Sequence, residues 1–201
     1  MGKTRGFTLV ELAIVLVIIG IILGAILKGQ ELLNNSRAKR LQNDLRGLEA
    51  AIWTFYDRFG KFPGDCDGDG TVNSYLPRSI SGLIYSSSPT SPSSLCTGTS
   101  ESADYPFDDL RYSRILSPNT PNNVLARHIF NDYFAIGYNG TPGYNAIAVY
   151  GVPNWVARMI DVSIDGTENG TVGRIQRWDN STDWPPNLDE QVTLIYYFDK
   201  M

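Results

Sequence analysis

Gly6-Phe7-Thr8-Leu9-Val10-Glu11-Leu12 opens an apolar run that continues to Leu27. Of the 21 residues in positions 7–27, only Thr8 and Glu11 are neither apolar nor glycine. About 20 apolar residues, each rising 1.5 Å along a helix, span a hydrocarbon core of roughly 30 Å. The stretch therefore predicts a membrane-spanning helix.

The segment before this run is a short leader, residues 1–6, that carries Lys3 and Arg5. Basic residues favour the cytoplasmic side, so we expect everything after Lys28 on the outer side of the membrane. Glu11 is the unusual residue, because a carboxylate inside an apolar segment costs about 2.5–3.5 kcal/mol on insertion scales and needs a partner. The alternative is that Glu11 lies close enough to the start of the segment to reach the lipid headgroups.

The basic leader, the glycine-phenylalanine step, the glutamate and the long apolar run together resemble the N-terminus of type IV prepilins and type II secretion pseudopilins. The resemblance implies that a prepilin peptidase/N-methyltransferase cuts after Gly6 and methylates the new N-terminus, Phe7. It also implies that Glu11, the fifth residue of the mature chain, pairs with the N-terminal amine of a neighbouring subunit during assembly. A secretory signal peptide is the alternative, but its apolar core usually has about 7–15 residues.

The same resemblance implies the organisation of the chain and its partners. We expect an α+β fold in which a long N-terminal helix packs on an antiparallel sheet with long loops. The expected partners are other pilin or pseudopilin subunits and an assembly platform in the inner membrane. The precursor would be a single-pass inner-membrane protein with a periplasmic globular domain, and the product a periplasmic pseudopilus or an extracellular pilus. The predicted segments are the leader 1–6, the membrane or filament-core half-helix 7–27, the amphipathic half-helix 28–59 and the globular domain 60–201.

An apolar stripe continues the helix beyond the membrane segment. Its members recur at spacings of four, three, four, three and four residues, which is the pattern of one helical face. Gly60 and Pro63 predict the end of the helix. The stripe comprises Leu41, Leu45, Leu48, Ile52, Phe55 and Phe59.

The rest of the chain alternates short apolar runs with turns. Asn139-Gly140 is a hairpin signal between two strand-like runs. Trp155, Trp178 and Trp184 are interpreted as core or edge packing. The expected helices are Asp108–Leu116 and Val156–Ile164, and the expected strands are Tyr133–Tyr138, Ala146–Val152, Thr171–Trp178 and Val192–Phe198.

Charge argues against a nucleic-acid partner. Loss of Lys3 and Arg5 with the leader lowers the 17 basic residues to 15 against 21 acidic ones, a balance of −6. Nucleic-acid affinity comes largely from Lys and Arg, so nucleic acid is an unlikely partner. A local basic patch of Arg111, Arg114 and Arg127 is the alternative that would allow binding.

Cys66 and Cys96 are the two cysteines of the chain, and both follow the membrane segment. An even pair in an oxidising compartment predicts a disulfide, which would stabilise the fold by roughly 3–4 kcal/mol in the chain-entropy model. Two separate thiols are the alternative.

An acidic turn, residues 65–73, is the best candidate chemical site. Asp65, Asp67 and Asp69, followed by Gly70, match the opening of a calcium loop, and the Thr71 carbonyl and Asn73 would continue the ligand set. The closing acid is absent because the twelfth position is Leu76. Further carboxylates would have to come from Asp104, Asp108 or Asp109. The alternative is a plain polar turn without metal.

A second acidic group, Asp161, Asp165 and Glu168, lacks tight ligand spacing and is interpreted as a solvated loop. His128 has no second histidine or cysteine near it, so it is interpreted as structural. No nucleotide, zinc or serine-hydrolase motif occurs, and an enzyme is not expected. The sequence thus predicts a structural pilin-like subunit, with a minor subunit favoured. The alternative is a membrane-anchored or tip-located calcium-dependent adhesin that uses the prepilin signal for export.

Overall fold

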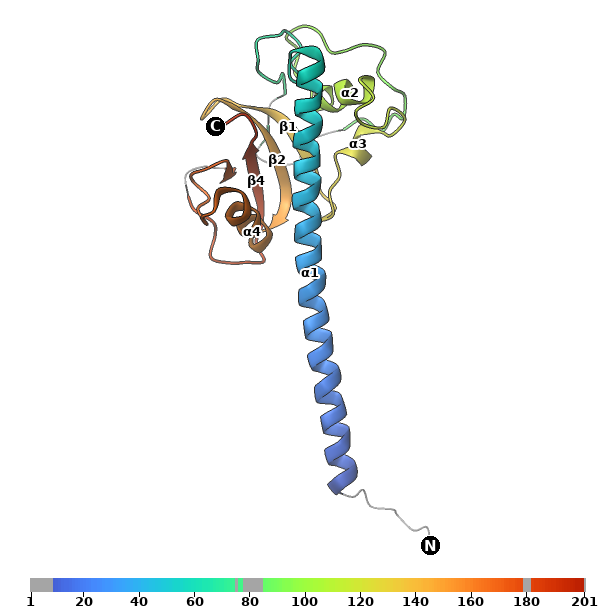
Figure 1. Ribbon diagram of the computed structural model, residues 1–201, viewed down its shortest axis with the longest axis vertical. Helices are drawn as coiled ribbons and strands as arrows, with labels where there is room; N and C mark the ends of the chain where they lie inside the picture. Colours follow the sequence, from blue (N-terminus) through green and yellow to red (C-terminus); the bar gives the residue numbers. More distant parts are fainter. Residues whose placement is uncertain (1–8, 75, 78–84, 179–181, 201) are drawn as a thin grey trace. The chain divides into compact units, whose positions relative to one another are not determined.

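The computed structural model describes residues 9–74, 76–77, 85–178 and 182–200. The chain forms two compact units, Met1–Lys39 and Arg40–Met201. We call them the N-terminal unit and the globular unit. Helix α1 passes from one into the other, whereas α2–α4 and the four strands belong to the globular unit (Figure 1). The fold is α+β, as the sequence predicts.

Helix α1 runs from Leu9 to Phe59, 51 residues without a proline. It ends where the sequence predicts, because Gly60 adopts a left-handed φ of 70° and its N–H donates to the Tyr56 carbonyl at 2.8 Å. Only glycine adopts this conformation without strain, so the helix stops there. The leader, Gly6 and Phe7 lie outside the described residues.

The part of α1 in the globular unit buries the predicted apolar stripe. Leu41, Leu45, Ile52 and Phe55 are fully buried. Phe59, the last member, is partly exposed and stacks on Phe55 with ring centroids 4.5 Å apart. Burial of each such side chain stabilises the unit by about 1.5–3 kcal/mol, so this stripe is a large part of the core.

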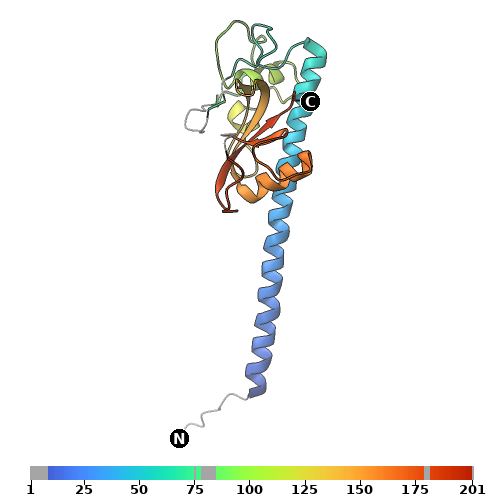
Figure 2. The same ribbon diagram turned by 90° about the vertical axis from the view of Figure 1, so that its left-hand side faces the viewer.

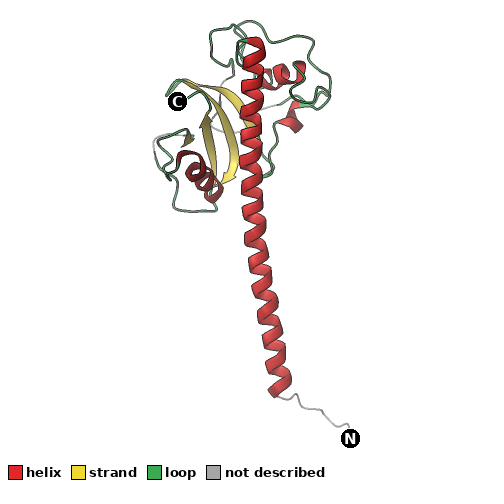
Figure 3. Ribbon diagram, viewed as in Figure 1, coloured by secondary structure: helices red, strands yellow, loops and turns green. Residues whose placement is uncertain are grey.

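The sheet has four antiparallel strands in the order β1-β2-β4-β3 (Figure 3). β1 and β2 form the predicted hairpin, with Asn139 opposite Tyr144. The register between β2 and β4 shifts between Val149 and Val152. Within this irregular stretch lies Gly151, where any side chain would collide with the Asp132 carboxylate. The strands are β1 Phe134–Asn139, β2 Tyr144–Pro153, β3 Ile175–Arg177 and β4 Gln191–Tyr197.

Three short helices complete the globular unit: α2 Tyr105–Tyr112, α3 Asn122–Leu125 and α4 Asn154–Asp165. α2 begins and ends earlier than predicted. Its first turn contains proline, which suits a helix start, and Arg114 just after it has a positive φ of 61°. β3 is much shorter than the predicted strand because Gly173, at φ 90°, turns the chain two residues before Ile175.

A buried arginine removes one member of the basic patch that was the alternative to the expected absence of a nucleic-acid partner. Arg111 is only 1% exposed. Its guanidinium donates to the carbonyls of Thr90 (2.7 Å) and Pro118 (3.1 Å) and to Asn122 Oδ1 (3.1 Å), and it lies 3.4 Å from the Asp108 carboxylate. A buried charge needs such partners. Arg111 therefore holds loops together and is not available to a nucleic acid.

The second acidic group is also not a solvated loop, and that interpretation is wrong. Asp161 lies in α4 and is fully buried. Its Oδ2 accepts hydrogen bonds from the Asn169 N–H (2.8 Å) and Trp184 Nε1 (2.7 Å), and Asp165 Oδ2 accepts one from the Ile175 N–H (2.7 Å). Burial, with Asp165 nearby, raises the pKa of Asp161 to about 6. Glu168 alone of the three is exposed, in an ion pair with Arg158.

Stability should therefore fall as pH rises through the Asp161 titration. The folded carboxyl binds its proton more tightly than the unfolded one, whose pKa is about 3.9, so the loss extends from about pH 4 to about pH 6. Burial also raises the pKa values of Asp108 and Asp109, which act in the same direction. Burial lowers the pKa of His128, which acts in the opposite direction, so the difference in Tm between pH 5 and pH 7.5 measures the sum of these effects. Thermal unfolding of the detergent-solubilised chain gives this difference, and the Asp161 contribution raises the Tm at pH 5 relative to that at pH 7.5.

Asp161→Asn should reduce this difference, because asparagine still accepts the two hydrogen bonds but does not titrate. The exposed Asp57→Asn should leave it unchanged. An equal pH dependence in the wild type and Asp161→Asn would contradict the assignment.

Candidate functional site

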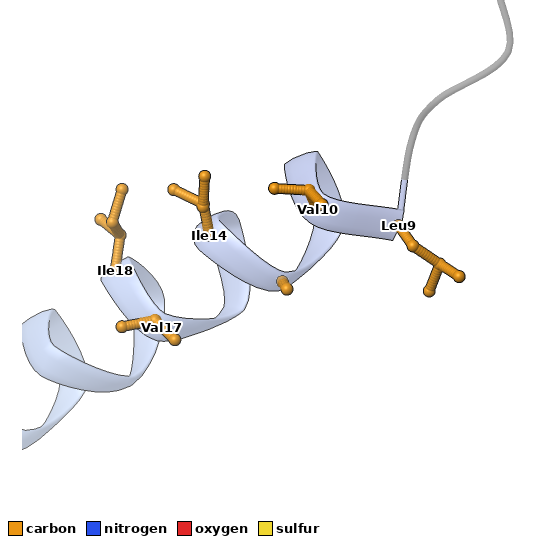
Figure 4. A pocket seen from close by; sticks show the side chains of 6 residues that line it. Leu9, Val10, Ile14, Val17 and Ile18 are labelled. Carbon is orange, nitrogen blue, oxygen red and sulfur yellow. The ribbon is translucent and has the colours of Figure 1, made fainter.

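The first candidate site is the apolar stretch of the N-terminal unit. The large apolar side chains among residues 9–27 are exposed by 47% to 90%. One window of α1 is long and apolar enough to cross a membrane, judged by length and composition. In the close view of its start, Val10, Ile14 and Ile18 project from one side of the helix at four-residue intervals (Figure 4). Together the residues form an apolar surface that the described residues of the N-terminal unit leave exposed.

Glu11 is the acidic residue in the first turn of α1. A negative side chain there is favoured by the partial positive charge at the helix N-terminus. Its predicted role in assembly, like the cleavage and methylation at Gly6 and Phe7, stays a prediction.

The second candidate site is the acidic turn of the globular unit. A carboxylate oxygen from each of Asp65, Asp67 and Asp69 lies within 4.8 Å of the others. Backbone N–H groups of the turn also donate hydrogen bonds to the turn's own carboxylates. Asp65 is buried, and its two carboxylate oxygens accept the N–H groups of Gly68 (2.7 Å) and Gly70 (3.1 Å).

The remaining predicted ligands also have protein partners. Asp69 Oδ1 accepts the backbone N–H of Thr71 at 2.7 Å and its hydroxyl at 2.6 Å, which lowers the pKa of Asp69. Asn73 Oδ1 accepts the Cys66 N–H at 2.6 Å. Asp67 is exposed. These contacts are those of a well-formed polar turn, and they leave Asp67 as the carboxylate least committed to it.

The carboxylates predicted to complete a calcium shell lie in other contacts. Asp109 accepts the Gly64 N–H with Oδ2 (2.8 Å) and the Cys96 N–H with Oδ1 (2.9 Å). Asp104 and Asp108 both accept hydrogen bonds from Asn122 Nδ2. Among the described residues, the acidic cluster thus contains only Asp65, Asp67 and Asp69.

The disulfide predicted from the sequence is present. Cys66 and Cys96 are joined with their Cα atoms 4.9 Å apart, and Asp109 bonds to the backbone beside both halves of the link. Among the described residues, neither cysteine is free. The acidic turn and the segment around Cys96 are therefore tied to each other and to α2.

Sequence reasoning missed Asn145. It is buried on β2, and its side chain accepts the Val72 N–H (2.9 Å) and donates to the Gly70 carbonyl (2.9 Å) and to Asp199 (2.9 Å). An asparagine beside an apolar run signals a buried polar group, but nothing in the sequence identifies its partners. His128 is buried as expected, with Nε2 2.8 Å from the Tyr150 carbonyl. Burial lowers the pKa of His128.

Comparison with known proteins identifies the N-terminal unit. Residues 1–27 match the family model of the prokaryotic N-terminal methylation motif. No curated protein and no solved structure matches the chain. The match covers the leader, the glycine-phenylalanine step, Glu11 and the apolar run. The chain therefore carries the prepilin-type signal for N-terminal cleavage and methylation.

Proposed function

We propose that this chain is a structural subunit of a type IV pilus or a type II secretion pseudopilus, in a minor rather than a major role. The observation that carries the proposal is the exposed apolar half of α1 directly after a methylation motif. Such a stretch has two stable environments, the lipid bilayer and the core of a bundle of like helices. A subunit that moves from one to the other keeps its apolar surface away from water throughout.

Processing prepares the helix for this transfer. Cleavage after Gly6 removes Lys3 and Arg5 and creates a new amine at Phe7, four residues before Glu11. In an apolar environment, an ammonium and a carboxylate each need an opposite charge. Pairing of Glu11 with the amine of a neighbouring subunit would give each group its opposite charge and would set the register of adjacent helices.

The proposed function implies a cellular location and a set of partners for the subunit. The precursor spans the inner membrane once, with the globular unit in the periplasm, and meets a prepilin peptidase and an assembly platform. The mature subunit then enters a periplasmic pseudopilus or an extracellular pilus with other pilin-like subunits. Its work is mechanical, and we propose no catalytic step.

A second candidate function is calcium-dependent adhesion by a membrane-anchored or tip-located module. The observation that favours it is the convergence of Asp65, Asp67 and Asp69 beside the Cys66–Cys96 link. Three carboxylates within reach of one another suit a hard cation. Binding would require Asp65 and Asp69 to accept the ion in addition to their present donors.

Glu11→Ala should block assembly without blocking processing. In cells that contain the assembly machinery, intact mass should show that wild type and variant both lack residues 1–6 and carry a methyl group at Phe7. Loss of one member of a buried ion pair costs about 3–5 kcal/mol, so the variant should fall at least roughly tenfold in the sheared filament fraction. Glu31→Ala is the matched control, since Glu31 is exposed and pairs with Lys28 on the same helix.

The cellular location distinguishes the outcomes. Cleaved protein that stays in the inner membrane in wild type and variant alike would indicate a priming or pseudopilus role. An uncleaved leader would contradict the proposal.

Asp65→Asn and Asp67→Asn separate the calcium candidate from a plain turn. Asp65 accepts two backbone N–H groups, so its loss should lower the Tm equally in EDTA and in calcium. Asp67→Asn should leave the Tm in EDTA unchanged. A calcium-dependent rise in the wild-type Tm that Asp67→Asn abolishes would support the adhesin candidate, and the absence of any rise would exclude it.

Loss of the disulfide should destabilise the globular unit. The link closes a 30-residue separation, so Cys66→Ser with Cys96→Ser should lower the free energy of unfolding by roughly 3–4 kcal/mol. Denaturant titration of the full chain in detergent measures the loss. Reductant should reproduce it in the wild type and leave the double variant unaffected, and an unchanged midpoint would contradict it.

A further inference from the structure

A surface groove of about 390 Å³ lies in the globular unit beside α1. Four apolar residues line it, and we call them its apolar floor: Leu48, Leu116, Leu125 and Phe134. Three charged residues, Arg40, Asp44 and Arg127, line it as well and are all exposed. The combination of an apolar floor and charged edges suits a peptide segment that carries one apolar side chain next to charged ones.

Gly47 opens the groove from the side of α1. It lies inside a helix, where glycine is a poorer residue than alanine. No atom lies within 4 Å of the place where its Cβ would be, so packing within the chain does not require glycine here. Its absent side chain leaves room in the groove.

Arg127 provides a positive charge that the rest of the globular unit does not neutralise. Its guanidinium donates to two neutral acceptors, Asn131 Oδ1 (3.0 Å) and the Tyr133 hydroxyl (2.8 Å), and stacks over the Tyr133 ring. No ion pair joins it to a carboxylate among the described residues. Arg40 lies 3.9 Å from Asp44, a weak exposed pair. With two arginines and one aspartate, the groove favours an acidic occupant.

A segment with the complementary chemistry lies on the surface of the same globular unit. Leu188-Asp189-Glu190, which we call the acidic knob, is exposed throughout, and Leu188 is 50% exposed. The carbonyls of Leu188 and Glu190 accept the N–H groups of Trp155 (3.0 Å) and Asn154 (2.8 Å) at the start of α4. The backbone of the knob is thus held in place, and no ion pair occupies either carboxylate in the described part of the chain.

The groove and the knob lie on different sides of the globular unit. The groove adjoins α3, and the knob is anchored to α4. These two helices lie on opposite sides of α1 in Figure 1, and α4 lies toward the viewer in the turned view of Figure 2. A contact between knob and groove would therefore join different copies. Such a contact uses two different surfaces and can repeat without closing, as a filament requires.

We propose that the acidic knob of one copy docks into the groove of the next. Leu188 contacts the apolar floor over Gly47, Glu190 pairs with Arg127, and Asp189 lies near Arg40. This contact rests on the proposed function, since both copies must stand side by side. A contact of this size is weak between free domains, but anchoring in one membrane raises the effective concentration of the partners.

Cross-linking of the full chain in membranes of cells with the assembly machinery tests the arrangement. Asn43→Cys marks the groove and Gln191→Cys the position after the knob, and both residues are exposed. With a short bis-maleimide, the double variant should give a ladder of dimers and higher oligomers, whereas each single variant should give none. A dimer from one single variant would indicate a symmetric contact and would overturn the proposal. The proposal would also be overturned if the double variant gave no cross-linked oligomers.

Charge exchange tests the pairing itself. Arg127→Glu and Glu190→Arg should each reduce the ladder and the sheared filament fraction at least threefold, and the two changes together should restore both. The matched controls are Arg114→Glu and Glu101→Arg, exposed charges outside groove and knob, which should have no effect. Failure of the exchange to restore the ladder would overturn the proposal, because a folding defect at Arg127 cannot be repaired by Glu190→Arg on an opposite face.

Gly47→Leu offers an independent readout. Leucine favours the helix, so the Tm should not fall, yet it fills the groove and should remove the ladder. Unchanged cross-linking would contradict the docking. The proposed function can fail separately. It would be rejected if the leader stayed uncleaved or if Glu11→Ala left filament assembly unchanged. If assembly required Glu11 but did not respond to the charge changes at Arg127 and Glu190, only the contact between knob and groove would be rejected.

Discussion

The apolar first half of α1 is the constraint on which the rest of the molecule depends. Its large side chains are exposed by 47% to 90%, and each would gain about 1.5–3 kcal/mol on leaving water. In an apolar medium the backbone must also satisfy its own hydrogen bonds, which a continuous helix does. The need for such surroundings explains why this segment is helical and why it lacks proline.

The globular unit depends on a different kind of contact. Residues 60–104 contain no helix or strand among those described, yet their backbone is held by buried polar side chains. The Asp109 carboxylate accepts the N–H groups of Gly64 and Cys96. The Asn145 side chain bonds to the Gly70 carbonyl and the Val72 N–H. Arg111 donates to the Thr90 carbonyl. A buried polar group that lost its partner would cost about 1–3 kcal/mol, so these residues specify one loop arrangement. The same network holds the backbone of the acidic turn through Asn145.

Prediction from sequence succeeded where the physics is local. The extent of α1 follows from apolar spacing and Gly60, and the hairpin follows from Asn139-Gly140. The helix expected over Val156–Ile164 lies within α4. It failed where distant residues decide the outcome. Asp161 and Arg111 look like solvent-exposed charges in the sequence, but Trp184 and Asn122, many residues away, supply the partners that allow burial. In the acidic turn, the carboxylates were found by their spacing, whereas their donors and the role of Asn145 depend on tertiary packing.

The Cys66–Cys96 link has a consequence for the order of events during maturation. Cytoplasmic thiols are kept reduced, so under the proposed topology the link can close only after this region has crossed the membrane. Asp109 bonds to the backbone on both sides of the link, and the Gly98 N–H donates to the Cys66 carbonyl, so closure also settles the loops around it. Under the proposed topology, a subunit whose Cys66–Cys96 link is closed and whose loops are settled has therefore already been exported. An assembly machine that binds only subunits with these settled loops would therefore not bind chains that are still crossing the membrane.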